Sequence, residues 1–121
     1  MRYFNPAPFI AVAAVVAFAA GPAAAHARLV SATPAPDSTV AATRTLTLTF
    51  SETVEPRFSQ VTLQGPDGQP IGVPAFTPSA NGKTLTIPLP NLPPGDYRLS
   101  WRVISVDTHR TEGRFTFTVR P

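Results

Sequence analysis

The feature that most constrains the fold is a series of short runs in which apolar and polar residues alternate, separated by Pro and Gly. The clearest run is residues 45–50, Thr-Leu-Thr-Leu-Thr-Phe, which places Leu46, Leu48 and Phe50 on one face. A helix would need apolar residues three and four positions apart, so this period of two predicts a strand that buries one face. Similar runs occur at residues 29–30, 58–64, 71–76, 84–87, 96–106 and 113–119.

These runs predict an all-β domain of about seven strands, because turn signals recur about every 8–12 residues, as in antiparallel β-sandwiches. A β-barrel is the alternative architecture. The Pro-limited run 71–76 is expected at a sheet edge, because Pro cannot donate to a strand ladder. The core is expected to contain the large side chains of the longest runs, namely Phe50, Tyr97, Trp101, Phe115 and Phe117.

Residues 1–25 differ in composition from the rest of the chain and predict a secretory signal peptide. Arg2 is followed by an apolar, Ala-rich run over residues 9–20, which ends at a Gly-Pro pair. This is the order of a signal peptide, and the run is shorter than the roughly 20 apolar residues of a membrane-spanning helix. We therefore expect one exported domain, residues 26–121, with no membrane span after cleavage.

Two cleavage positions satisfy the preference for small residues before the cut. Cleavage after Ala25 leaves His26 as the first residue, whereas cleavage after Ala27 leaves Arg28. The chemistry of cleavage favours the first position, and the second stays open. The difference matters because only the first makes His26 a terminal residue with a free α-amine.

The composition excludes chemistry that depends on sulfur. The chain has no Cys, and its one Met is residue 1, which leaves with the signal peptide. Disulfides, thiolate metal sites and thiol nucleophiles are therefore excluded. The net charge is +3, with Lys and Arg scattered mostly as single residues, so we expect no nucleic-acid partner. Catalytic motifs such as a G-x-S-x-G elbow are missing, and we expect a protein that is not an enzyme.

The two histidines are the most informative polar residues. His109 follows a long apolar strand, in the sequence Ser105-Val106-Asp107-Thr108-His109. Asp107 and His109 are two positions apart, so in an extended backbone their side chains point the same way. This spacing suits two ligands of one metal ion, or a carboxylate that orients an imidazole. An ordinary turn without a ligand role is the alternative.

A mature N-terminus at His26 would offer an imidazole and an α-amine to one metal ion as a chelate. The reference pKa of such an amine is about 7.7–8.0, so a metal ion can displace its proton near neutral pH. With Asp107 and His109 the set becomes three nitrogens and one carboxylate oxygen. Such a set suits Cu(II) in a tetragonal geometry, and zinc is the alternative. Whether residues 26 and 109 meet is not visible in the sequence.

Several segments resemble the CopC family of periplasmic copper-binding proteins. They are His26-Ala27-Arg28-Leu29-Val30-Ser31-Ala32-Thr33-Pro34, Phe50-Ser51-Glu52, Trp101-Arg102-Val103-Ile104-Ser105-Val106-Asp107-Thr108-His109 and Gly113-x-Phe115-x-Phe117-x-Val119. The resemblance covers essentially all of residues 26–121, with the motifs in the same order. It implies a Greek-key β-sandwich of immunoglobulin-like or cupredoxin-like shape.

The resemblance also implies binding of Cu(II) in the periplasm for copper tolerance, sequestration or delivery, with an inner-membrane copper transporter as a partner. The family's ligands, an N-terminal His and a D-x-H pair, fall on His26, Asp107 and His109. The acidic residue of its F-S-E motif falls on Glu52, which we carry over only as a weak candidate ligand.

One family feature is missing, the Met-rich loop in which some members hold Cu(I). Residues 64–83 contain no Met and no His, and Cu(I) needs soft thioether ligands, so no Cu(I) site is expected. We expect a monomer. The alternative function is a secreted β-sandwich module without metal, which binds a protein partner.

Overall fold

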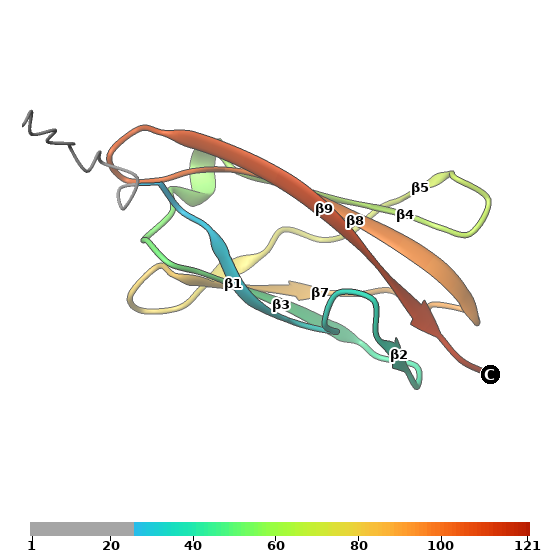
Figure 1. Ribbon diagram of the computed structural model, residues 1–121. Coiled ribbons are helices and arrows are strands. Elements are labelled where there is room, and N and C mark those ends of the chain that lie inside the picture. Colours follow the sequence, from blue (N-terminus) through green and yellow to red (C-terminus); the bar gives the residue numbers. More distant parts are fainter. Residues whose placement is uncertain (1–25) are drawn as a thin grey trace, which may run out of the picture.

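The structure, a computed structural model, describes residues 26–121, and the predicted signal peptide 1–25 lies outside the described residues. Two β-sheets pack face to face (Figure 1). One sheet has the strand order β1-β3-β7-β6 and the other the order β2-β9-β8-β4-β5. The strands are β1 Leu29–Thr33, β2 Thr39–Val40, β3 Thr45–Phe50, β4 Gln60–Gln64, β5 Pro70–Ile71, β6 Thr77–Pro78, β7 Thr84–Pro88, β8 Gly95–Ile104 and β9 Arg110–Val119. The predicted all-β sandwich is confirmed, and the barrel alternative is wrong.

Strand β3 forms the centre of the four-stranded sheet, as its alternating sequence predicts. Leu46, Leu48 and Phe50 are at most 1% exposed, whereas the Thr residues between them are exposed or half-buried. The strand pairs antiparallel with β1 on one side and with β7 on the other. The alternation therefore points one face of β3 at the core and the other at solvent.

A long hairpin of β8 and β9 forms the centre of the five-stranded sheet. The two strands have ten residues each and pair along their whole length, from Gly95 opposite Val119 to Ile104 opposite Arg110. The loop that joins them contains the D-x-H segment. Figure 1 shows this loop and the start of β1 at the same end of the sandwich, away from the C-terminus.

The core between the sheets contains the predicted aromatic side chains, with two exceptions. Phe50, Tyr97 and Phe117 are each 1% exposed, but Trp101 and Phe115 are only partly buried against the core. Trp101 lies opposite Gly113 in the hairpin register, and a Cβ added to Gly113 would lie 2.5 Å from the indole. The indole thus occupies the space that a side chain at position 113 would need.

The expected run 71–76 is not one continuous strand, although the short strands β5 and β6 at its two ends both lie at sheet edges, as predicted. Pro70–Ile71 pairs with β4 in the five-stranded sheet, whereas Thr77–Pro78 pairs with β7 in the other sheet. The chain therefore crosses from one sheet to the other within this segment. Pro74 lies between the two short strands and has no N–H to continue a ladder, which is consistent with the interruption.

Two further strand boundaries differ from the sequence pattern. The expected strand 58–64 begins only at Gln60, because Pro56–Phe58 form a 3₁₀ turn. The two-residue strand Thr39–Val40 was not predicted, and it pairs parallel with the end of β9. The sandwich is therefore antiparallel except for this pair. Within residues 26–121, none of the helical segments has the length and apolar character to cross a bilayer.

Candidate metal centre

The two histidines meet at one end of the sandwich. His26 lies just before β1 and His109 just before β9, and their ring centroids are 4.4 Å apart with the planes tilted by 51°. The separation of 83 positions between these residues hid this contact from the sequence. The fold therefore brings together two imidazoles that the sequence identified only as separate candidate ligands.

The segment that carries His26 is hydrogen-bonded to the loop after β3 and to strand β9. The Ser51 hydroxyl donates to the His26 carbonyl at 3.4 Å and accepts from the Arg28 amide at 2.9 Å, and the Ser51 amide donates to the Arg28 carbonyl at 2.8 Å. On the other side, the Thr111 hydroxyl donates to the Ala27 carbonyl at 2.9 Å. Ala27 is 1% exposed. Residues 26–28 are thus part of the packed domain.

The loop that carries His109 is closed by its own backbone. The Ser105 amide donates to the His109 carbonyl at 2.9 Å, and the Thr108 amide donates to the Ser105 carbonyl at 2.8 Å. Thr108 has a φ of 72°, a left-handed conformation that β-branched residues rarely adopt. The loop therefore reverses the chain over few residues, with Asp107 and His109 on either side of Thr108.

Asp107 faces His109 within this loop. Its Oδ1 lies 3.3 Å from the His109 Nδ1 and accepts a hydrogen bond from the Ser105 hydroxyl. The Ser105 hydrogen bond, followed by the hydrogen bonds and charge of His109, lowers the pKa of the Asp107 carboxyl. The His109 and Asp107 side chains are 50% and 38% exposed, so both are accessible to an ion from solvent.

The three predicted ligands touch in pairs, without forming a ready-made cage. Within residues 26–121, no three His, Cys, Asp or Glu side chains are grouped closely enough to hold one metal ion. His26 contacts His109, and His109 contacts Asp107. The fourth predicted donor, the His26 α-amine, exists only after cleavage, because in the full-length chain this nitrogen belongs to a peptide bond with Ala25. The pair of imidazoles is therefore the part of the site that the fold brings together directly.

The weaker candidate Glu52 lies in the loop after β3, at the same end of the sandwich. The next residue, Thr53, accepts a hydrogen bond at 3.1 Å from the Val106 amide, so this loop adjoins the segment that carries Asp107. The Glu52 side chain is half-buried, and no hydrogen bond or ion pair of its carboxylate is found within residues 26–121. The structure thus brings Glu52 near the loop without joining it to either histidine.

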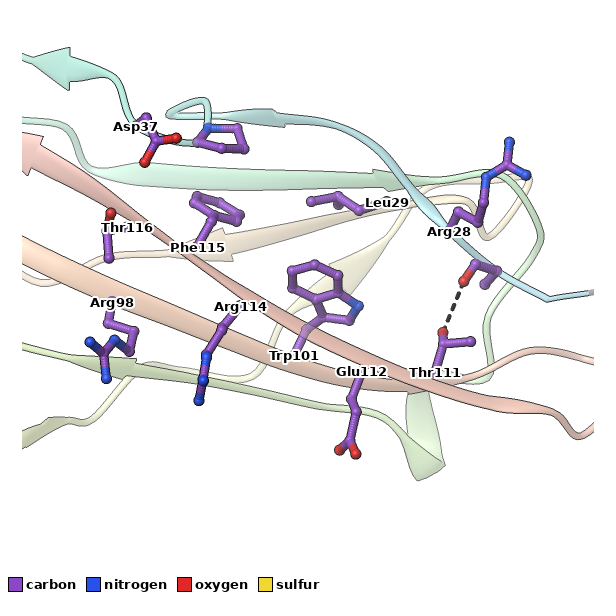
Figure 2. Close-up of a pocket in the computed structure, with 12 residues that line it drawn as sticks. Arg28, Leu29, Asp37, Arg98, Trp101, Thr111, Glu112, Arg114, Phe115 and Thr116 are labelled. Carbon is purple, nitrogen blue, oxygen red and sulfur yellow. Dashed lines mark hydrogen bonds between the residues drawn. The ribbon is translucent and has the colours of Figure 1, made fainter.

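A groove of about 760 Å³ lies beside this site, between the start of β1 and β9. Figure 2 shows the side chains of Leu29, Trp101 and Phe115 pointing into it, with the Thr111 hydrogen bond at one end. None of the three predicted ligands lines this groove. It explains why Trp101 and Phe115 are only partly buried. The sequence carried no signal for it, because it arises from the separation of two sheet edges.

The residues that support the histidines were also missed by sequence reasoning as functional residues. Ser51 and Ser105 stand inside the quoted motifs, so they could have been singled out as hydroxyls next to candidate ligands. Thr111 could not, because its contact with Ala27 spans 84 positions. These hydroxyls hold the segments that bear the imidazoles.

Comparison with known proteins shows which family shares this two-sheet β-sandwich. The family model for the CopC domain matches residues 29–120, and the chain belongs to the CopC family. Relatives include the copper resistance protein C of Escherichia coli, which is 42% identical over 106 residues, covering 81% of this chain and 84% of the relative. Protein YobA of E. coli K12 is 42% identical over 99 residues, covering 79% and 80%.

Solved structures of relatives have the same fold. CopC from Methylosinus trichosporium OB3b superposes with a TM-score of 0.75 and 34% identity, over 79% of this chain and 95% of that protein. PcoC from E. coli, described as a methionine-rich copper resistance protein, superposes with a TM-score of 0.71 and 39% identity, over 79% and 100%. The resemblance, the fold and the copper resistance family are confirmed. Proteins of this family bind copper and are not enzymes, as expected for this chain.

Proposed function

We propose that this protein carries Cu(II) in the periplasm, held by His26, Asp107 and His109, with copper as its cargo. The donors are the two imidazoles, the α-amine that cleavage before His26 releases, and the Asp107 carboxylate. Three nitrogens and one oxygen match the tetragonal preference of Cu(II). The observation that carries the proposal is the 4.4 Å separation of the two imidazole rings, which come from residues 83 positions apart in the sequence.

The anchoring of residues 26–28 supports signal cleavage after Ala25. Cleavage after Ala27 would remove a residue that is 1% exposed and whose carbonyl accepts the Thr111 hydrogen bond at 2.9 Å. It would also remove the His26 carbonyl that the Ser51 hydroxyl contacts. Since these contacts belong to the packed domain, a mature chain that starts at His26 preserves the fold and creates the terminal amine.

The donor chemistry favours Cu(II) over Cu(I). The relative PcoC is described as methionine-rich, whereas this chain has no Cys and one Met, residue 1. After cleavage before His26 no sulfur ligand is left, and Cu(I) prefers thioether or thiolate ligands. By binding Cu(II), the protein would support copper tolerance, either by sequestering the ion or by delivering it. The partner for delivery would be an inner-membrane copper transporter. We propose that the carrier acts as a monomer.

The test begins with the intact mass of the exported protein, which should correspond to residues 26–121. Titration should then give one tightly bound Cu(II) per chain with a tetragonal spectrum, and no stable Cu(I) complex. The substitution His109→Ala should weaken Cu(II) binding by about 100-fold or more, since even indirect partners of metal ligands contribute 10–100-fold. Arg110→Ala, at the exposed next position, is the matched control and should bind like the wild type.

Three results would contradict the proposal. A mature chain that starts at Arg28 would lack the chelating terminus. Unchanged Cu(II) affinity in His109→Ala would remove the imidazole pair from the site. A wild-type protein that takes up no Cu(II) would leave the alternative of a β-sandwich module that binds a protein partner.

A further inference from the structure

Ser105 is the polar residue that the fold buries next to the candidate metal centre. It is 1% exposed and is the one fully buried polar or charged residue in the described range 26–121. It lies directly after β8, where an isolated bridge pairs it with Val54. A buried hydroxyl without a partner would be costly, so the contacts of this hydroxyl indicate what it does.

The Ser105 hydroxyl points at the D-x-H segment. It donates to the Asp107 Oδ1 and lies 3.3 Å from the His109 carbonyl oxygen. An ionised carboxylate can only accept, so the proton of this hydrogen bond belongs to the serine. Hydrogen bonds to an ionised acceptor are about twice as strong as neutral ones. The stronger of the two contacts is therefore the one to Asp107.

This hydrogen bond restrains a carboxylate that is otherwise free to turn. The Asp107 side chain is 38% exposed, and the contacts that the structure gives it within residues 26–121 all involve Oδ1. These contacts come from the Ser105 hydroxyl, the His109 amide at 3.4 Å and the His109 Nδ1 at 3.3 Å. Oδ1 is held in this way, and the His109 Nδ1 lies beside it at 3.3 Å.

We propose that Ser105 is a positioning residue of the metal centre, which orients Asp107 and, through it, the His109 imidazole before copper arrives. The inference rests on the proposed function. Its physical basis is that a rigid, buried donor reduces the rotamer freedom that Asp107 and His109 would otherwise lose on binding. Groups that orient metal ligands typically contribute 10–100-fold in metal affinity.

The alternative role for Ser105 is purely structural, as the residue that closes the hairpin. Its backbone amide donates to the His109 carbonyl and its carbonyl accepts from the Thr108 amide. Both bonds persist in Ser105→Ala, which removes only the hydroxyl and introduces no larger group. This substitution therefore separates the positioning role of the side chain from the closure of the loop.

Ser59 provides a matched control at the same end of the fold. Its part-buried hydroxyl donates to the Glu55 carbonyl at 2.8 Å and accepts from the Ile104 amide at 3.1 Å. None of its contacts reaches the side chains of Asp107 or His109. Ser59→Ala thus removes a hydroxyl that supports the same loop region without acting on a candidate ligand.

The experiment measures Cu(II) affinity by competition with a chelator and the electron paramagnetic resonance spectrum of the one-to-one complex. Ser105→Ala should weaken binding by about 10–100-fold and alter the copper spectrum. In the metal-free protein, the ring resonances of His109 should shift and broaden. Ser59→Ala should keep the wild-type spectrum, and its Cu(II) affinity should stay within about threefold of the wild-type value. A change of that size is typical of substitutions that remove no important contact.

A double-substitution cycle gives the decisive comparison. If Ser105 acts through Asp107, then Ser105→Ala should cause little further loss in an Asp107→Asn background, because the charged acceptor has gone. The inference is overturned if Ser105→Ala matches the wild type, if it matches Ser59→Ala, or if its effect is undiminished in Asp107→Asn. Absence of Cu(II) binding by the wild type would overturn the proposed function and this inference together, whereas an unaffected Ser105→Ala would overturn only the inference.

Discussion

The two segments that supply the imidazoles are held in place by opposite means. His26 belongs to a terminal segment whose hydrogen bonds reach Ser51, directly after β3 of the four-stranded sheet, and Thr111 in β9 of the five-stranded sheet. His109 belongs to a loop whose main contacts lie within residues 105–109. One half of the site thus depends on long-range packing, and the other half on a short stretch of sequence.

This difference separates what assembles the site from what shapes it. The local loop can adopt its conformation wherever a hairpin of β8 and β9 forms, since its hydrogen bonds span few residues. The terminal segment finds its place only when both sheets have formed and packed together. The two imidazoles therefore come together only in the complete fold. Substitutions in the terminal segment and in the loop should differ in their effects on Cu(II) binding and on stability.

The largest expected effect comes from removing the long-range half. A mature chain that begins at Arg28 lacks the His26 imidazole, shifts the amine, and loses the buried Ala27 with its hydrogen bond from Thr111. Cu(II) affinity should fall by about 100-fold or more, and the free energy of unfolding by about 1–2 kcal/mol. Chelator competition measures the first quantity, and urea unfolding followed by Trp101 fluorescence measures the second.

A chain that starts at His26 with an acetylated α-amine is the control for this truncation. It keeps every contact of residues 26–28 and removes only one nitrogen donor. Stability should match the unmodified protein, while Cu(II) affinity should fall by less than in the truncated chain. Wild-type affinity in the chain that starts at Arg28 would show that copper binds elsewhere.

An intermediate effect is expected at Thr111, where only the tie to the terminal segment is cut. Thr111→Val keeps the side-chain shape but leaves the Ala27 carbonyl without the donor that now lies at 2.9 Å. An acceptor left unpaired costs about 1–3 kcal/mol when buried. The hydrogen bond as a whole is only part-buried, so we expect about 1 kcal/mol, with Cu(II) affinity reduced by up to about tenfold. Hydrogen exchange at residues 27–29 should quicken.

Two further substitutions test whether this effect belongs to the tie itself. Thr111→Ser retains the hydroxyl and should recover most of the lost affinity. Thr118→Val, in the same strand, removes a hydroxyl that contacts the exposed Asp96 carboxylate at 2.7 Å, and copper binding should not change. If Thr111→Val and Thr118→Val behaved alike, the order of the terminal segment would not control the site.

The same contrast explains how much of the site could be predicted from the sequence. The D-x-H spacing identified Asp107 and His109 on the assumption of an extended backbone. In the structure a turn with Thr108 at a φ of 72° brings the two side chains together instead. The pairing of His26 with His109 could not be predicted from physical patterns, because it depends on how two sheets pack. Resemblance to the CopC family supplied that expectation, and the ring separation of 4.4 Å gives it a physical basis.

The fold shows a similar division between local and long-range determinants. Alternation predicted β3, β7, β8 and β9 well, because each has one face that is buried between the sheets. It failed at 71–76, where the chain crosses between sheets, and at the two-residue strand Thr39–Val40. Segments this short have no period to detect, and their pairing is decided by the strands around them.

The smallest expected effect comes from the local half, at Thr108. Its φ of 72° is unfavourable for a β-branched residue but is tolerated by Asn. Thr108→Asn should therefore raise the free energy of unfolding by about 1 kcal/mol, or a few degrees in melting temperature. Cu(II) affinity should change by less than about threefold, because the loop keeps its backbone hydrogen bonds and loses only the one from the Thr108 hydroxyl to the Asp107 carbonyl. Calorimetry with and without Cu(II) checks both values. A large change in affinity would mean that the Thr108 side chain, and not only the backbone around it, shapes the site.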